Sequence, residues 1–177
     1  STVAVQTNGN VTVSNAQALT VGTVSRDLQG TTASTSGINT QKNNVAVAGR
    51  VLNVSTNGSN ADLTIQQALN NPGGLVAVQA LGETLNATAM PAQRGNAINQ
   101  AGAGAINAAD LIVRAQDNSD LTLTGNQFNR LAVDMSTGGG DLSVVRGAAT
   151  ADAITIDSLT IPTNSTSAAL APTVNGV

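Results

Sequence analysis

Carboxylates are the only side chains of this sequence whose type and spacing could support catalysis. Asp117 and Asp120 lie three residues apart in QDNSD, and Asp134 and Asp141 flank the glycine run Gly138–Gly140. A pair of carboxylates on either side of a scissile bond can hydrolyse a glycoside, and right-handed β-helices host enzymes of this kind. A polysaccharide-degrading enzyme, or a module that binds polysaccharide, is therefore the alternative that these residues leave open.

A structural role explains the same aspartates more simply. Asp62, Asp110, Asp120 and Asp141 each precede a leucine at the start of an alternating segment. An aspartate at that position accepts hydrogen bonds from nearby backbone N–H groups and stabilises a turn. We therefore assign no catalytic residue, no cofactor-binding residue and no metal ligand, and we expect neither enzymatic activity nor a cofactor.

The composition removes most other kinds of chemistry. The 177 residues contain no His, Cys, Trp or Tyr, and Phe128 is the only aromatic side chain. Without His or Cys there is no Ser-His-Asp or Cys-His system and no thiolate metal site. The formal net charge of −3 and the dispersed arginines predict no nucleic-acid partner. No run of 18 apolar residues is present, so we also expect no membrane span.

Three smaller features have structural interpretations. TGGGDLSV (137–144) is one approximate copy of the Gly-Asp motif of calcium-loaded β-rolls, which place an aspartate in successive turns. Weak calcium binding at turn Asp and Asn oxygens is an alternative left open. We expect Phe128 to fill the core at a corner, with an exposed receptor contact as the alternative, and Arg114 and Arg130 to pair with nearby aspartates.

The main pattern of the chain is strict alternation of Leu, Val or Ile with Thr, Ser or Ala, interrupted by turns rich in Gly and Asn. Alternation with period two predicts strands that bury one face. The predicted strands are TVAVQ (2–6), VTVS (11–14), ALTVGTV (18–24), VAVAG (45–49), VLNVST (51–56), DLTIQQAL (62–69), LVAVQA (75–80), TLNATA (84–89), DLIVRAQ (110–116), DLTLTGNQ (120–127), LAVDMST (131–137), DLSVVRG (141–147) and AITIDSLTI (153–161).

The spacing of these segments predicts the architecture. Leu52, Leu63, Leu75 and Leu85 are 11, 12 and 10 residues apart, and a similar step runs from Leu111 to Ile154. Two strands per coil give about 21 residues, which is the size of one turn of a parallel β-solenoid. We therefore predict an all-β, right-handed parallel β-solenoid (β-helix) of about seven coils, with an antiparallel sandwich as the alternative.

The predicted domain boundaries follow from breaks in the alternation. The solenoid spans residues 1–161, and 162–177 is an extended C-terminal tail or linker rich in Ser, Thr, Ala and Pro. Ser25–Ser36 is polar and predicts a loop that projects from the coil. Met90–Asn96 predicts a second loop.

The order of the motifs also resembles a known family. ALTVGTV (18–24), GIN (37–39), NVAV (44–47), LTIQQALNNPGGLVAVQA (63–80), INQAGAGAINAADLIV (98–113) and LTLTGNQFNRLAV (121–133) are similar to the repeat region of filamentous-haemagglutinin-type, two-partner-secreted bacterial exoproteins. The resemblance covers about 18–161. It departs from the family pattern where SRDLQG follows VGTV, and no family counterpart exists after Ile161.

The resemblance implies a β-helical fibre exported to the bacterial surface and used as an adhesin or stalk. We therefore expect a non-enzymatic extracellular structural protein that serves adhesion or cell-surface and matrix assembly. The strand pattern shows no obvious polar cap, so the expected partners are identical subunits or neighbouring repeats that continue the stack end to end. Host or matrix glycans are further candidate partners.

Overall fold

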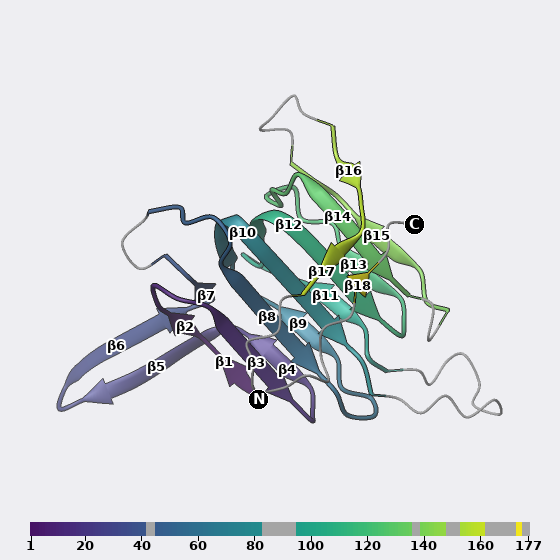
Figure 1. Cartoon of the computed structure of the whole chain (residues 1–177). Helices are drawn as coiled ribbons and strands as arrows, with labels where there is room; N and C mark the ends of the chain where they lie inside the picture. Colours follow the sequence, from purple (N-terminus) through teal and green to yellow (C-terminus); the bar gives the residue numbers. More distant parts are fainter. Residues whose placement is uncertain (42–44, 83–94, 136–138, 148–152, 162–172, 175–177) are drawn as a thin grey trace.

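The strands of this chain assemble almost entirely into parallel sheets. The computed structural model describes residues 1–41, 45–82, 95–135, 139–147, 153–161 and 173–174 (Figure 1). These residues are all-β, as predicted, and among them no helix is long and apolar enough to cross a membrane. The predicted strand TLNATA (84–89) and most of the predicted loop Met90–Asn96 lie outside the described residues.

Six short parallel strands form the first sheet. Each time the chain comes back to this sheet it adds one strand. One outward-facing residue of each strand lies in a single row across the sheet: Thr2, Thr20, Thr64, Asn99, Asp120 and Ser143. Neighbouring strands follow the order β1 (Thr2–Val3), β4 (Leu19–Val21), β9 (Leu63–Ile65), β11 (Ile98–Gln100), β13 (Ser119–Leu121) and β15 (Leu142–Val144).

Eight parallel strands form the second sheet. Its main order is β16 (Thr155–Ile156), β14 (Arg130–Asp134), β12 (Ile106–Ala115), β10 (Leu69–Ala80), β7 (Ile38–Asn39) and β2 (Val5–Gln6). Strand β8 (Val51–Thr56) pairs with the second half of β10 and with β3 (Val11–Asn15). From β8 to β16 the chain alternates between the second and the first sheet, and each return adds a strand beside the previous one.

Aliphatic side chains from both sheets form one core between them. Val54, Val78 and Val113 stack in register on adjacent strands and are fully buried. Burial of such a side chain contributes about 1.5 to 3 kcal/mol, so a row of small residues can stabilise the sheets without aromatic side chains. Phe128 is 1% exposed and belongs to this core, as expected, so it is not an exposed receptor contact.

The predicted loop Ser25–Ser36 is instead most of an antiparallel hairpin. Strands β5 (Thr23–Leu28) and β6 (Thr31–Ser36) pair over their whole length and extend away from both sheets (Figure 1). Gln29 and Gly30 form the turn with φ angles of 53° and 86°, which is the geometry that two-residue hairpins use. Polarity alone was misleading, because threonine, which occurs three times in this segment, is polar and favours strands.

Two further predictions about strands were wrong. VAVAG (45–49) contains no strand, and Val45 and Val47 are 62% and 38% exposed, because no described strand pairs with it. The spacing also treated Leu52 and Leu75 as equivalent positions of adjacent coils, but they are not stacked: Leu52 pairs with Val76, and Leu75 pairs with Val51. A one-residue offset reverses the face of a strand, and two adjacent apolar residues leave that choice open in the sequence.

Because Val76 faces the core, Leu75 points to the opposite side of the second sheet, which we call the outer face. A second apolar cluster lies there. Leu75, Ala77, Ile112 and Ala132 alternate with core residues along β10, β12 and β14, so they point away from the first sheet. The segment after β16 covers them: it contains β17 (Leu159–Thr160), which pairs antiparallel with β18 (Thr173–Val174).

Candidate functional site

The closely spaced carboxylates Asp117 and Asp120 are engaged in local turn hydrogen bonds. Asp117 Oδ1 accepts the backbone N–H of Asn118 at 2.7 Å. Asp120 Oδ1 accepts the N–H of Thr122 at 3.0 Å, as a turn-stabilising aspartate should. Asp117 therefore stabilises the backbone just before β13, and Asp120 stabilises the backbone just after it.

The carboxylates that flank the glycine run belong to different sheets. Asp134 ends β14 in the second sheet, where its Oδ2 lies 3.2 Å from Arg114 Nε. Asp141 precedes β15 in the first sheet, and its backbone N–H donates to Asn118 Oδ1 at 2.8 Å. Among the described residues no group of three or more acidic side chains is placed to hold a metal ion.

Two of the predicted turn aspartates have other roles. Asp62 Oδ1 accepts the N–H groups of Asn96 and Ala97, both at 2.9 Å, so it joins two neighbouring strands of the first sheet rather than its own turn. Asp110 lies in the middle of β12 and not at a strand start, because that strand begins at Ile106. Its carboxylate forms an ion pair on the outer face.

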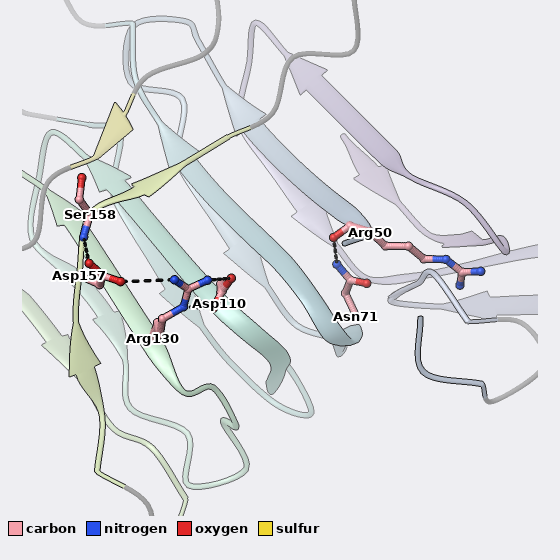
Figure 2. Close-up of polar contacts among 6 residues, drawn as sticks. All are labelled: Arg50, Asn71, Asp110, Arg130, Asp157 and Ser158. Atoms are coloured by element: carbon pink, nitrogen blue, oxygen red, sulfur yellow. Dashed lines mark hydrogen bonds and ion pairs between the residues drawn. The ribbon is translucent and has the colours of Figure 1, made fainter. Parts of the chain in front are cut away.

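Arg130 on β14 links Asp110 on β12 to Asp157, which follows β16, on the outer face (Figure 2). Its Nη2 lies 2.6 Å from Asp110 Oδ2, its Nε donates to Asp110 Oδ1 at 2.7 Å, and its Nη1 lies 3.3 Å from Asp157 Oδ2. The hydrogen bonds and the charge of Asp110 raise the pKa of Arg130 above its usual value. The pairing of Arg130 with a nearby aspartate is confirmed.

A second polar row on the outer face is more buried. Gln79 Nε2 donates to Asn53 Oδ1 at 2.8 Å, and Arg114 Nη1 donates to Gln79 Oε1 at 3.2 Å. With the Arg114–Asp134 ion pair, this row joins β8, β10, β12 and β14. Asn53 and Gln79 are only 7% and 3% exposed, so their amides depend on these mutual hydrogen bonds.

Three asparagines, Asn71, Asn96 and Asn126, are fully buried between strands. Asn126 Oδ1 accepts from the backbone N–H of Ile106 at 2.9 Å and from Gln100 Nε2 at 2.7 Å. Its Nδ2 donates to Gln100 Oε1 at 3.0 Å and to the carbonyls of Leu121 and Val145 at 2.9 and 3.0 Å. One side chain therefore satisfies backbone groups of both sheets.

Asn71 and Asn96 bond other buried polar groups between strands. Asn71 Nδ2 donates to the carbonyls of Arg50 and Leu75 at 3.1 and 2.8 Å, and its bond to Arg50 is drawn in Figure 2. Asn96 has a φ of 76°, a conformation that asparagine tolerates better than most residues. Its Nδ2 donates to Gln116 Oε1 at 2.8 Å and its Oδ1 accepts Ala61 N–H at 2.7 Å.

These buried amides are the structural residues that the sequence interpretation missed. The sequence is rich in asparagine, and solvent-exposed turn asparagines such as Asn118 look the same in it as the buried ones. Position gave no signal either, because Asn126 lies inside the predicted strand DLTLTGNQ (120–127) and Asn96 ends the predicted loop Met90–Asn96. Their hydrogen bonds hold neighbouring strands in register.

The chain was also compared with known proteins. No family model, no curated protein and no solved structure matches it.

Proposed function

We propose that this chain is a right-handed parallel β-solenoid unit of a bacterial surface fibre or filament, with a structural role in adhesion or in cell-surface and matrix assembly. The observation that carries the proposal is the alternation of the chain between two parallel sheets from β8 to β16, each return stacking on the last. A coil that rises by one strand per turn produces this order of strands.

The side chains support a structural role. Rows of like residues, such as Val54, Val78 and Val113, repeat from strand to strand. Buried amides including Asn126 supply the hydrogen bonds that corners between strands need. Such a stack resists local unfolding because every interior strand is paired on both sides, which suits a fibre under load.

The bacterial and extracellular setting rests on the resemblance to filamentous-haemagglutinin-type repeats. Identical subunits or neighbouring repeats are the proposed end-to-end partners, and host or matrix glycans are the proposed ligands of an adhesive fibre. Catalysis is not part of the proposal, because Asp117, Asp120 and Asp134 each make structural bonds that an acid or base would have to leave.

Two measurements test this proposal. Antibodies raised against the chain should label intact, unpermeabilised cells of the source bacterium along surface fibres, and label confined to the cytoplasm would contradict it. Incubation with a panel of glycans should release neither reducing ends nor unsaturated products. Clear turnover, abolished by D117N, D120N or D134N, would instead establish a polysaccharide-degrading enzyme.

A further inference from the structure

The two ends of the stack carry strands that are paired on one side only, counting the described residues. At one end β1, β2 and β3 pair with β4, β7 and β8, and at the other β15 and β16 pair with β13 and β14. Each of these end strands presents backbone N–H and C=O groups to which a further strand could be added.

The end strands lack the residues that block strand addition. Natural proteins protect exposed edges with charged side chains and proline. None of these five strands contains either; Asp141 and Asp157 lie immediately outside β15 and β16. Interior strands do contain them: β12 and β14 carry Asp110 and Arg130, and β10 carries Pro72.

The core is also incompletely covered at both ends. Ile156 on β16 is 49% exposed, although the residue beside it in the same row, Leu131 on β14, is 4% exposed. Val144 on β15 and Val3 on β1 are only partly buried against the core. A further strand over each end would remove this apolar surface from water, which stabilises association.

The described chain does not itself supply the missing strand after β16. Beyond Asp157 it turns onto the outer face of the second sheet, where Leu159 and Ile161 pack on the apolar cluster and are 5% and 2% exposed. Strand β17 then pairs with β18 and not with β16 (Figure 1).

The two ends match each other in register. In the first sheet, the outward row begins at Thr2 on β1 and ends at Ser143 on β15, so a strand added beside β15 would place its own residue next to Ser143. In the second sheet, the core row that begins at Val11 ends at Ile156. Placing Thr2 of a second copy beside Ser143 puts the polar residues of one row together, and Val11 then falls on Ile156.

We propose that β15 and β16 of one copy receive β1 and β3 of a second copy as parallel strands, with Thr2 beside Ser143 and Val11 beside Ile156. The joint is head to tail and leaves the same two ends free, so it repeats into a filament. This inference rests on the proposed solenoid and names its partner, a second copy of this chain, and the register of their contact.

Cysteine pairing tests the register directly, because the chain has no native cysteine. Adjacent parallel strands are about 4.8 Å apart, within the Cα separations that a disulfide spans. Mixing a Thr2→Cys chain with a Ser143→Cys chain under mild oxidation should give a mixed disulfide dimer. A Thr20→Cys chain is the matched control: Thr20 shares the row but lies on an interior strand, so its yield with Ser143→Cys should be at least tenfold lower.

A second pair of variants tests the apolar contact without cysteine. Sedimentation of the unmodified chain should show association that grows with concentration, and Ile156→Lys should abolish it. Val24→Lys changes a similarly exposed valine on the β5–β6 hairpin and should leave association unchanged.

The outcomes separate the joint from the proposed function. A chain that stays monomeric at high concentration, with the far-UV circular dichroism of a folded β protein and no Thr2–Ser143 disulfide, overturns the joint and leaves the surface-fibre proposal standing. Equal disulfide yields for Thr2→Cys and Thr20→Cys also overturn it, because they indicate random collision. Cytoplasmic label on cells overturns the surface fibre and not the joint.

Discussion

Replacing Asn126 by alanine removes the buried amide with the most hydrogen bonds described above. Its side chain makes five: two with Gln100 and one each with the backbone of Ile106, Leu121 and Val145. The alanine leaves the N–H of Ile106 without its Asn126 partner in a region closed to water. A buried unsatisfied group costs about 1 to 3 kcal/mol. The Gln100 amide and the Leu121 carbonyl keep other hydrogen-bond partners, so the Ile106 N–H dominates and the cost lies near the upper end of that range.

We therefore expect Asn126→Ala to lower the free energy of unfolding by about 3 kcal/mol, a large part of the roughly 5 to 15 kcal/mol of a natural domain. Urea unfolding followed by far-UV circular dichroism measures this, since the chain has no Trp or Tyr for fluorescence. With a slope of about 2 to 3 kcal/mol per molar, the urea midpoint should fall by about 1 M.

Asn118→Ala is the matched control. Asn118 is also a turn asparagine whose Oδ1 accepts a neighbouring backbone N–H, that of Asp141, at 2.8 Å, but it is exposed. Water can replace its hydrogen bond, so the expected loss is below about 1 kcal/mol. If the two variants lose equal stability, burial of Asn126 is not what makes its hydrogen bonds important, and the reasoning is refuted.

Three further predictions concern the core, a close contact and a surface ion pair. Leu121→Asp should prevent folding, seen as loss of the β spectrum, because it buries an unpaired charge at a fully buried position; a native spectrum would contradict this. Gly104→Ala should destabilise strongly in urea, because its Cβ would lie 1.9 Å from the carbonyl oxygen of Ile65, whereas Gly9→Ala, with its nearest atom at 3.8 Å, should be nearly neutral. Arg130→Met should cost less than about 1 kcal/mol and the loss should shrink in 1 M salt, because the Arg130 side chain is 46% exposed and solvent screens its charge. The raised pKa of Arg130 means that this contribution is fully present below the unfolded-state pKa and is lost only as pH rises through the folded-state pKa, so it should be constant from about pH 6 to 10.

Strands with strict alternation were the most predictable part of the fold. VLNVST (51–56) is a strand with the predicted bounds. Leu52 and Val54, two residues apart, both face the core, and this spacing is visible in the sequence. VAVAG (45–49) has equally good alternation but no described partner strand, and it is not a strand. Local pattern gives the tendency to form a strand, while pairing with a distant segment decides whether it forms.

The outer face could not be predicted for a different reason. Leu75, Ala77 and Ile112 are apolar on the face that a solenoid exposes, because Leu159 and Ile161 cover them. A strand buried on both faces loses its alternation, so the sequence does not show which of Leu75 and Val76 faces the core. The aspartates illustrate the same limit: turn bonding was confirmed for Asp120, whereas Asp62 bonds a segment 34 residues away.

Cross-strand nuclear Overhauser effects test the central claim, two parallel sheets stacked by returns of the chain, most directly. At 17.5 kDa the chain is suited to this measurement. The parallel sheets predict contacts between amide and α protons linking Thr20 to Thr64 and Thr64 to Asn99, and strong contacts between facing α protons only in antiparallel pairs such as β5–β6. Strong contacts between α protons of β8 and β9, which follow each other in sequence, would instead show an antiparallel sandwich and contradict the fold.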